Sequence, residues 1–472
     1  MDREYKLLID GVMQSGFTSF DVVNPATGEV FAQCPKADRA MLDQAVAAAK
    51  RAFPSWAAMP IEERASLVEQ VADAVELRVK EFAALLTREQ GKPLDQANGE
   101  VMGTVNVLRT VAKMRLETQV LSESHQKKVI EHRTPLGVVA AITPWNFPLI
   151  LLANKFAPAL VTGNTMISKP APTTPLTSLL FAEICQSILP PGVFNILCDE
   201  NELGAALTSH PDVAKVTFTG STETGKKVLQ SSAGGLKRVT LELGGNDASI
   251  VLDDVDPVQV AQKVFQGSMR NAGQICFAIK RVYVPETMYD VFCEELARLA
   301  KEAVVDDGAN QGAQIGPVQN RQQFEKVSAL IEDSKGRGNI IAGGEPLNRA
   351  GYFISPTIVR DIADDAPLVR QEQFGPVLPV LKYSDVEELL QRVNDSEYGL
   401  AGTVWSNDVE RAFEVARRIN TGTVWINQLQ ALDPSIPFRG AKSSGIGGEA
   451  GLEGFHEYTQ AHIISAAPTI AA

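Results

Sequence analysis

The sequence has few of the residues that build disulfide frameworks, metal centres or nucleic-acid-binding surfaces. Its 472 residues include five cysteines and five histidines, and no two cysteines have the CxxC spacing. We therefore expect neither a disulfide framework nor a metal site, and a reducing, cytoplasmic location fits best. Acidic residues outnumber basic ones by 57 to 44, giving a net charge of −13. Without a surplus of cations to replace counterions on phosphate, no nucleic-acid partner is expected.

Long uninterrupted apolar runs are also missing. The most apolar window, residues 136–163, is interrupted by Pro144, Asn146, Pro148, Asn154, Lys155 and Pro158. It predicts buried core rather than a membrane span, and we expect no membrane partner. The first residues, MDREYKLLIDG, contain no apolar segment typical of a signal peptide.

Periodicity in the N-terminal half predicts an α/β fold. The chain is about three times as long as a typical domain, so at least two cores are expected. Apolar residues at helical spacing predict helices over 38–53 and 61–90. Short apolar runs then predict strands at 136–143, 165–169, 193–197, 214–219 and 239–243, separated by helical segments such as 174–189 and 222–231. This alternation indicates a doubly wound α/β domain with a parallel sheet covered on both faces.

Ligands of such sheets bind beyond the carboxyl ends of the strands. In VTLELGG, the two-residue period of a strand separates Glu242 from the face of Leu241 and Leu243. Glu242 either approaches a cleft or is a solvated edge residue. Gly220 and Gly225, in FTGSTETG, occupy a strand-to-helix turn that either binds an anion such as a pyrophosphate or is a plain turn.

Two further loops carry polar side chains at strand ends. Lys169, in SKPAP, either offers its ammonium group to ribose hydroxyls or phosphate or is an ordinary surface lysine. Asn146 lies between Trp145 and Phe147 in PWNFP, with a proline on each side of the three. A rigid loop of this kind can aim an amide as an oxyanion donor, although asparagine is also common in turns.

Cys276, in NAGQICFAIK, is either a small buried apolar residue or a nucleophile. All five histidines lie outside these segments, so a Cys-His dyad has no evident partner. If Cys276 is a nucleophile, Glu242 is the natural candidate for its base, acting through a water.

Six motifs occur in order: TPWNFP, FTGSTETG, LELGG, GQICFA, QEQFGPV and PFRGAKSSGIGGEAG. Together, over nearly the whole chain, they resemble the NAD(P)-dependent aldehyde dehydrogenase superfamily. The resemblance implies that Cys276 is the catalytic thiol, Glu242 the general base and Asn146 the oxyanion-hole amide, with Lys169 beside them. It also implies a dinucleotide site formed by Trp145, Lys169, Pro172, Gly220, Ser221, Gly225, Glu372 and Phe374. Glu372 is expected to hold the nicotinamide-side ribose.

The resemblance also implies the domain organisation and the assembly. A Rossmann-like cofactor domain would comprise residues 1–116 and 136–244, and an α/β catalytic domain residues 245–443. A small β oligomerisation element would comprise 117–135 and 444–472. A homodimer or homotetramer is expected.

The implied reaction begins when the thiolate adds to an aldehyde, giving a thiohemiacetal whose oxyanion meets Asn146 and the Cys276 N–H. Hydride passes to the nicotinamide, and Glu242 activates the water that hydrolyses the resulting thioester. Two routes to the thiolate remain open: the site lowers the pKa of the thiol, or Glu242 takes its proton.

Three departures from the family pattern limit what the resemblance implies. Pro172 stands where a ribose-binding glutamate is common, so NADP is not repelled there, although NAD is favoured. Gly448 replaces a common arginine. Asn154 replaces an aromatic residue of the substrate tunnel, which we expect to be lined by Phe147, Leu151, Asn154, Ile275, Phe277 and Phe438. A mainly apolar tunnel with one amide suits medium aliphatic or aromatic aldehydes.

Other functions remain open. A semialdehyde dehydrogenase would need a cation for the terminal carboxylate of its substrate, and Arg439 is the one candidate, although a surface or interface role suits it better. Transfer of the acyl group to coenzyme A would make Glu242 unnecessary. A thiol esterase without redox function would leave the nucleotide-site residues unused, and a non-catalytic binding protein would not need Cys276, Glu242 and Asn146 together.

Overall fold

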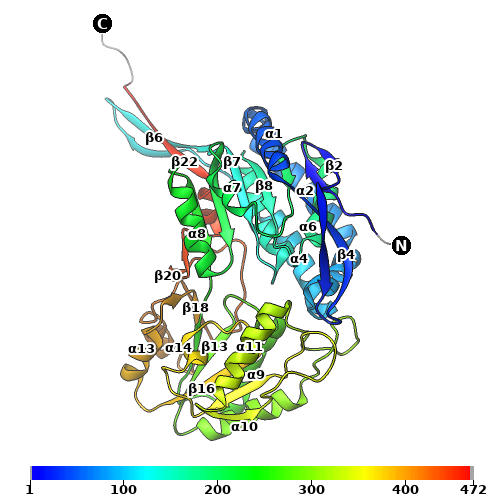
Figure 1. Cartoon of the computed structure of the whole chain (residues 1–472). Helices are drawn as coiled ribbons and strands as arrows, with labels where there is room; N and C mark the ends of the chain where they lie inside the picture. The colour runs from blue at the N-terminus through cyan, green and yellow to red at the C-terminus, as the bar shows by residue number, and fades with distance from the viewer. Residues whose placement is uncertain (1–2, 468–472) are drawn as a thin grey trace.

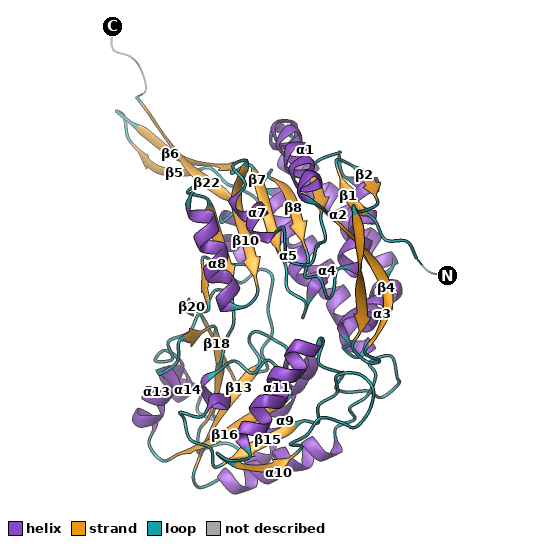
Figure 2. Ribbon diagram, in the orientation of Figure 1, coloured by secondary structure: helices purple, strands orange, loops and turns teal. Residues whose placement is uncertain are grey.

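The computed structural model describes residues 3–467. The chain forms two lobes, each built on its own sheet and its own apolar core, and a small sheet projects from the first lobe (Figures 1 and 2). The sheets are largely parallel and are accompanied by helices, which confirms the predicted α/β class.

The first lobe contains an eight-stranded sheet in the order β2-β1-β9-β8-β7-β10-β11-β21. Its strands are β1 (Leu7–Ile9), β2 (Val12–Gln14), β7 (Val138–Ile142), β8 (Thr165–Lys169), β9 (Phe194–Ile196), β10 (Val213–Thr219), β11 (Arg238–Glu242) and β21 (Gly445–Ile446). The five strands predicted from the sequence form its parallel centre, whereas β1 and β21 pair antiparallel with its two ends. Their carboxyl ends lie along one edge, which faces the second lobe (Figure 2).

Most helices of this lobe lie in the N-terminal half of the chain. They are α1 (Arg39–Ala58), α2 (Ile61–Leu77), α3 (Val79–Gln90), α4 (Leu94–Ala112), α5 (Pro148–Val161), α6 (Leu176–Ile188), α7 (Gly204–Ser209) and α8 (Thr222–Ala233). The single helix predicted over 61–90 is wrong, because Arg78, with φ −113° and ψ 18°, breaks it into α2 and α3. The apolar residues keep helical spacing on both sides of the break, so the periodicity does not reveal it.

The second lobe contains a seven-stranded sheet in the order β14-β15-β16-β13-β12-β18-β19, with only β14 antiparallel to its neighbour. Its strands are β12 (Asp247–Val251), β13 (Ile279–Pro285), β14 (Asn339–Ala342), β15 (Thr357–Arg360), β16 (Val377–Tyr383), β18 (Ala401–Trp405) and β19 (Thr423–Ile426). Its helices are α9 (Pro257–Met269), α10 (Tyr289–Glu302), α11 (Arg321–Ser334), α12 (Pro367–Arg370), α13 (Val386–Asn394) and α14 (Val409–Ala416), and a 3-10 turn, η1 (Arg270–Gly273), follows α9.

Smaller elements complete the fold. The projecting antiparallel sheet consists of β5 (Gln119–Glu123), β6 (Lys128–Pro135) and β22 (Thr459–Ala466) (Figure 1). Two further antiparallel pairs are β3 (Thr18–Asn24) with β4 (Glu29–Lys36) and β17 (Tyr398–Gly399) with β20 (Ala441–Lys442). The last helix of the described residues is α15 (Gly451–His456). Across residues 3–467, no helix combines the length and apolar character needed to cross a bilayer. Within the same range, no three His, Cys, Asp or Glu side chains group in a way that could hold a metal ion.

Candidate active site

Cys276 lies in the loop that joins η1 to β13. This loop leaves α9 through three successive residues in the left-handed region: Asn271 at φ 51°, Ala272 at φ 53° and Gly273 at φ 72°. A Cβ atom at Gly273 would lie 2.3 Å from the carbonyl oxygen of Gly375, so only glycine fits there. Such strain persists only where the surroundings fix the backbone, and here it turns Cys276 toward the first lobe.

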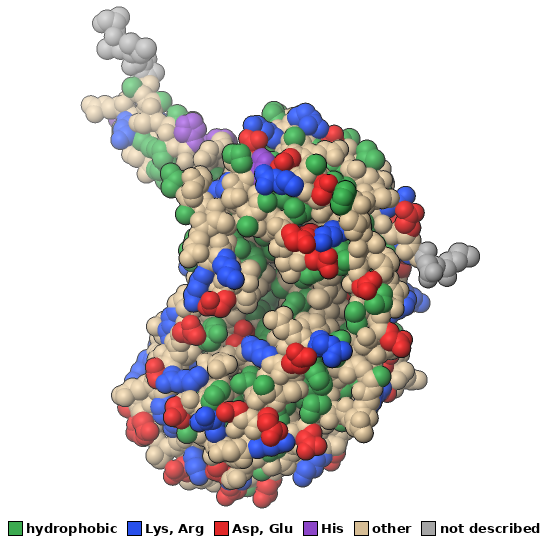
Figure 3. All heavy atoms as spheres, in the orientation of Figure 1, with side chains coloured by type: hydrophobic (Ala, Val, Ile, Leu, Met, Phe, Trp, Pro, Cys, Tyr) green, Lys and Arg blue, Asp and Glu red, His purple; other side chains and the backbone are tan. Residues whose placement is uncertain are grey.

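Two cavities meet at Cys276, in the hollow between the lobes that Figure 3 shows. One is a cleft of about 150 Å³ and the other a tunnel of about 310 Å³. Cys276, Glu242 and Asn146 line both of them. The thiol, the carboxylate and the amide, which lie far apart in the sequence, therefore occupy one junction.

Glu242 ends β11 and is only 5% exposed, so the alternative of a solvated edge residue is wrong. Neither of its carboxylate oxygens has a hydrogen-bond partner within residues 3–467. Burial, and then the charge of Glu449, raises the pKa of Glu242 to about 8. A carboxyl group with such a pKa can exchange protons near neutral pH, as a general base must.

Burial, and then the charge of Glu242, raises the pKa of the Cys276 thiol well above its ordinary value. Lys280 acts in the opposite direction. The protein environment therefore favours the neutral thiol, so the expected lowering of the thiol pKa by the site is not what the structure shows.

Asn146 lies in the loop before α5 and is 3% exposed. Its side-chain Nδ2 donates a hydrogen bond to the carbonyl oxygen of Gln274, at 3.0 Å. An amide NH₂ group has two hydrogens, so one fixes the orientation of the group and the other is left for a ligand.

The predicted cofactor residues fall into two groups. Trp145, Gly220, Ser221, Glu372 and Phe374 line the cleft. Lys169, Pro172 and Gly225 do not. The Lys169 ammonium lies 2.6 Å from the Asp199 carboxylate, Pro172 is half-buried between β8 and α6, and Gly225 packs under Leu243 in α8.

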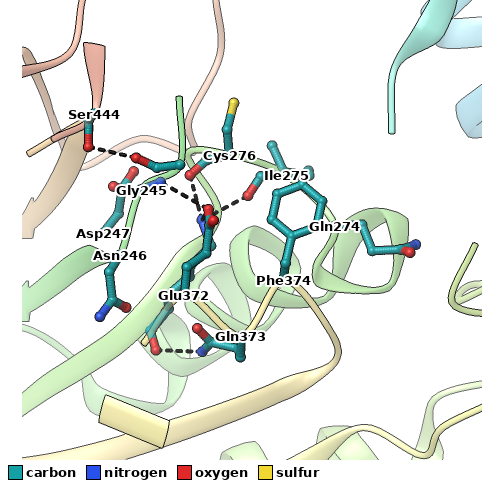
Figure 4. Close-up of polar contacts among 12 residues, drawn as sticks. Gly245, Asn246, Asp247, Gln274, Ile275, Cys276, Glu372, Gln373, Phe374 and Ser444 are labelled. Atoms are coloured by element: carbon teal, nitrogen blue, oxygen red, sulfur yellow. Dashed lines mark hydrogen bonds and ion pairs between the residues drawn. The ribbon is translucent and has the colours of Figure 1, made fainter. Parts of the chain in front are cut away.

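Glu372 connects the cleft to the nucleophile loop. Its Oε1 accepts a hydrogen bond from the Gly245 N–H at 2.9 Å and lies 3.4 Å from the Lys280 ammonium. Lys280 donates to the carbonyl oxygens of Ile275 and Cys276. Figure 4 shows these carbonyls near Glu372, whereas the sulfur of Cys276 points away from it. The loop backbone is thus held on one side and the thiol is left facing the cavities.

All six predicted tunnel residues, Phe147, Leu151, Asn154, Ile275, Phe277 and Phe438, line the tunnel. The Phe277 ring lies 5.9 Å from Trp425 and 5.7 Å from Phe438, measured between centroids. Polar residues also line it, namely Asn106, Gln266, Arg270, Gln430 and Asp433. Arg439, the candidate cation for a substrate carboxylate, does not line the tunnel and forms an ion pair with Glu453.

Sequence reasoning missed several charged residues around the site. Lys155 and Glu449 form a buried ion pair, and Glu449 lines the tunnel. A lysine within the otherwise apolar segment PLILLANKFAPALV was a usable signal, because such a charge must find a partner. Lys92, Lys280 and Arg270 gave no comparable signal, because none of them interrupts an apolar segment of this kind.

Comparison with known proteins identifies the family of this chain. The model of the "Aldehyde dehydrogenase family" matches residues 12–464. A putative aldehyde dehydrogenase, DhaS, of Bacillus subtilis is 38% identical over 96% of this chain and 94% of its own length. The NADP-dependent succinate-semialdehyde dehydrogenase GabD of Escherichia coli is 36% identical over 94% of this chain and 93% of its own. The NAD⁺ complex of an aldehyde dehydrogenase from Bacillus cereus superposes with a TM-score of 0.97 at 37% identity, covering 99% of this chain and 97% of that one. This chain therefore belongs to the aldehyde dehydrogenase family and is an NAD(P)-dependent enzyme.

Proposed function

We propose that the protein oxidises an aldehyde to the carboxylic acid, without coenzyme A, through a covalent intermediate on Cys276. The observation that carries this proposal is the junction of the cleft and the tunnel, where Cys276, Glu242 and Asn146 line both cavities. A cofactor in the cleft and an aldehyde in the tunnel would reach the same sulfur from two sides. Measuring acid and reduced cofactor, with and without added coenzyme A, tests it, because a strict requirement for coenzyme A would contradict it.

The residues around the cleft suit a nicotinamide dinucleotide. Ser221 is the N-cap of the 12-residue helix α8, whose first N–H groups and dipole favour a phosphate. Glu372 offers a carboxylate to ribose hydroxyls, and Trp145 and Phe374, 5.3 Å apart between ring centroids, provide apolar walls. A Cβ at Gly244 would lie 2.5 Å from Glu372 Oε2, so glycine there leaves room for that carboxylate. When bound, the nicotinamide accepts the hydride.

The side chains at the junction divide the remaining work. Glu242 takes the proton of the Cys276 thiol, and the sulfur adds to the aldehyde carbon. The free N–H of the Asn146 amide and the Cys276 N–H stabilise the oxyanion. After oxidation the substrate is held as a thioester on Cys276. Glu242 then removes a proton from the water that hydrolyses it, and the acid leaves.

Pro172 is proposed to permit NADP as well as NAD. Replacing it by glutamate should weaken NADPH binding about 10- to 100-fold, because a carboxylate would repel the 2′-phosphate. NADH binding should be unchanged or tighter. Fluorescence titration of both reduced cofactors measures this without turnover, and the neutral Pro172→Gln variant is the control for side-chain size. Equal NADPH affinity in the Glu and Gln variants would contradict the assignment.

The tunnel favours an aldehyde with an apolar body. The apolar side chains of the tunnel include Ile275, Phe277 and Phe438, and the amide of Asn154 is the predicted polar exception. We propose medium aliphatic or aromatic aldehydes as substrates. A panel of aldehydes of increasing chain length, assayed for kcat/KM, tests this.

Arg270 favours a second candidate class, aldehydes that carry a carboxylate. Its exposed guanidinium lines the tunnel, and its side chain has no hydrogen-bond or ion-pair partner among residues 3–467. The Gln430 amide lines the same tunnel, and its Nε2 is likewise unpartnered within the described range. The acidic residues of the tunnel are Asp433, Glu449 and Glu242. The Asp433 carboxylate accepts two hydrogen bonds from Ser435, and Glu449 is paired with Lys155. The E. coli relative named as a succinate-semialdehyde dehydrogenase is consistent with this class.

Replacing Arg270 by methionine separates the two classes. If Arg270 binds a substrate carboxylate, kcat/KM for a carboxylate-bearing aldehyde should fall about 10- to 100-fold, the value of one charged hydrogen bond. The value for a neutral aldehyde of equal length should stay within about threefold. Equal effects on both substrates, or none, would rule out the carboxylate class.

The assembly is proposed to form through the projecting sheet. Val120 and Leu121 in β5 and Ile463 and Ile464 in β22 are large apolar residues with exposed fractions of 41–52%. We place the oligomerisation element at 117–135 and 444–472, the cofactor domain at 1–116 and 136–244, and the catalytic domain at 245–443. Light scattering should give the mass of a homodimer or homotetramer, and a monomer at micromolar concentration would contradict this.

A further inference from the structure

Lys92 and Glu100 form a fully buried ion pair beneath the predicted oxyanion residue. Their side chains have no exposed surface, and Nζ lies 2.5 Å from Oε2. Neither residue lines the cleft or the tunnel. Removing two charges from water costs free energy that their mutual attraction often does not recover, so a buried ion pair is weak evidence for a stabilising role. The other contacts of the two side chains are therefore more informative.

Those other contacts all reach the segment that carries Asn146. Lys92 Nζ donates to the backbone carbonyl oxygen of Asn146 at 2.9 Å and lies 3.7 Å from the centroid of the Phe147 ring. Glu100 Oε1 accepts hydrogen bonds from the backbone N–H groups of Leu149, at 3.0 Å, and Ile150, at 3.3 Å. The pair thus holds the residue with the amide and also caps the first turn of α5.

The turn between α3 and α4 directs the Lys92 side chain toward the Asn146 carbonyl. Gly91 ends α3 in the left-handed conformation, at φ 97°, and its Cβ position would be 2.8 Å from Pro317, so a larger residue would not fit. The Lys92 N–H is held by Gln90 Oε1 at 3.0 Å, and the N–H of Leu94 donates to the carbonyl oxygen of Gly308 in the second lobe. The lysine therefore extends from a backbone that is fixed on both sides.

The second lobe holds Asn146 from the other direction. Asn271 Nδ2 donates to the same Asn146 carbonyl oxygen at 3.2 Å, and the carbonyl oxygen of Gln274 accepts the side-chain amide. The Asn146 backbone is thus fixed by Lys92 and Asn271, and its side chain by Gln274. Of these contacts, only that of Lys92 brings a full charge.

We propose that Lys92, with Glu100 as its counter-ion, is a positioning residue. It holds the Asn146 amide where it can donate a hydrogen bond to the aldehyde oxygen as that oxygen becomes an oxyanion. This inference rests on the proposed function, since it assumes that Asn146 stabilises an oxyanion. Misplacing such a donor by about 1 Å can cost a hundredfold in rate without weakening substrate binding. The loss should therefore be seen in kcat rather than in KM.

The test uses Lys92→Met combined with Glu100→Gln, because methionine alone would leave the carboxylate buried and uncompensated. Glutamine retains an acceptor for the two N–H groups of α5. We expect kcat for aldehyde oxidation to fall about 10- to 100-fold, with KM changed less than about threefold. Cofactor-independent ester hydrolysis on the same thiol should fall by a similar factor, because it also forms an oxyanion.

The matched control is Lys237→Met. Lys237 Nζ also donates to two backbone carbonyls, those of His210 and Val213, but at the amino end of β10, away from both cavities. It should leave kcat within about twofold of wild type. A kcat loss in this control equal to that of the Lys92 variant would mean that any lysine bonded to backbone carbonyls has the same effect and would overturn the proposal.

A double-mutant cycle with Asn146→Ala distinguishes positioning from general damage. If Lys92 acts through Asn146, the Lys92→Met/Glu100→Gln change should lower kcat by less than about twofold once the amide is absent. Multiplicative losses in a variant that binds NADH normally would overturn the proposal. A wild-type turnover rate in Asn146→Ala itself would instead overturn the oxyanion role of Asn146, on which the inference rests.

Discussion

Replacing Cys276 by alanine should abolish aldehyde oxidation, with kcat at least about 10⁴-fold lower. An aldehyde does not readily release hydride until a nucleophile has made its carbon tetrahedral, and Cys276 is the only cysteine that lines either cavity within the described residues. Steady-state formation of reduced cofactor measures the loss. NADH binding, followed by fluorescence, should remain within about twofold of wild type, because the cleft keeps its other walls.

The matched control for this substitution is Cys293→Ala. Cys293 is fully buried in α10, in a core cluster of the second lobe that contains no residue of the junction. Its loss should cost some stability but leave kcat within about twofold. Turnover above about 1% of wild type in Cys276→Ala, with normal cofactor binding, would show that the sulfur is not the nucleophile.

Glu242→Gln should separate acylation from hydrolysis. We expect one equivalent of reduced cofactor, formed more slowly than in wild type because the Cys276 thiol loses its base. Steady turnover should be slower still, about 10²- to 10⁴-fold below wild type, because no base activates the water that hydrolyses the thioester. Stopped-flow absorbance of reduced cofactor resolves the two phases. Glu286→Gln, an exposed position after β13, should behave as wild type. Linear progress curves at the wild-type rate would remove Glu242 from this role.

The same carboxyl group predicts the pH dependence. Since burial raises the pKa of Glu242 to about 8, wild-type kcat should rise as pH increases through about 8. A folded-state pKa above the unfolded one of about 4.3 gives stability that is present at low pH and is lost as pH rises toward 8. Glu242→Gln should therefore be more stable than wild type at pH 9 in thermal unfolding. Equal or lower stability there would contradict the buried, raised-pKa carboxyl.

Much of the first lobe could be predicted from the sequence. Five parallel strands were predicted to within two residues at each end, because their apolar runs are short and bounded by Gly, Pro and Asn. Glu242, Gly220 and the PWNFP loop all follow such strands, and the carboxyl ends of parallel strands meet at one edge of a sheet. That rule alone brings Asn146 and Glu242 together.

The rest depends on contacts that periodicity does not encode. Lys92 reaches the Asn146 carbonyl across 54 residues, and Lys155 reaches Glu449 across 294. Nothing in the sequence distinguishes Arg270 from the other arginines. Its place on the tunnel wall, next to the left-handed turn that follows α9, is seen only in the structure. The break at Arg78, and the choice of second-lobe residues that line the tunnel, likewise follow from packing between elements that are distant in the sequence.

The most direct test of the covalent intermediate on Cys276 is the mass of the protein after reaction. Glu242→Gln, incubated with an aldehyde and NAD⁺ and then digested, should carry an adduct equal to the aldehyde less two hydrogen atoms, on the peptide that contains Cys276. Omitting NAD⁺ should remove this adduct, since the thioester cannot form without oxidation. An unmodified Cys276 peptide, or the same adduct on a different residue, would contradict the account.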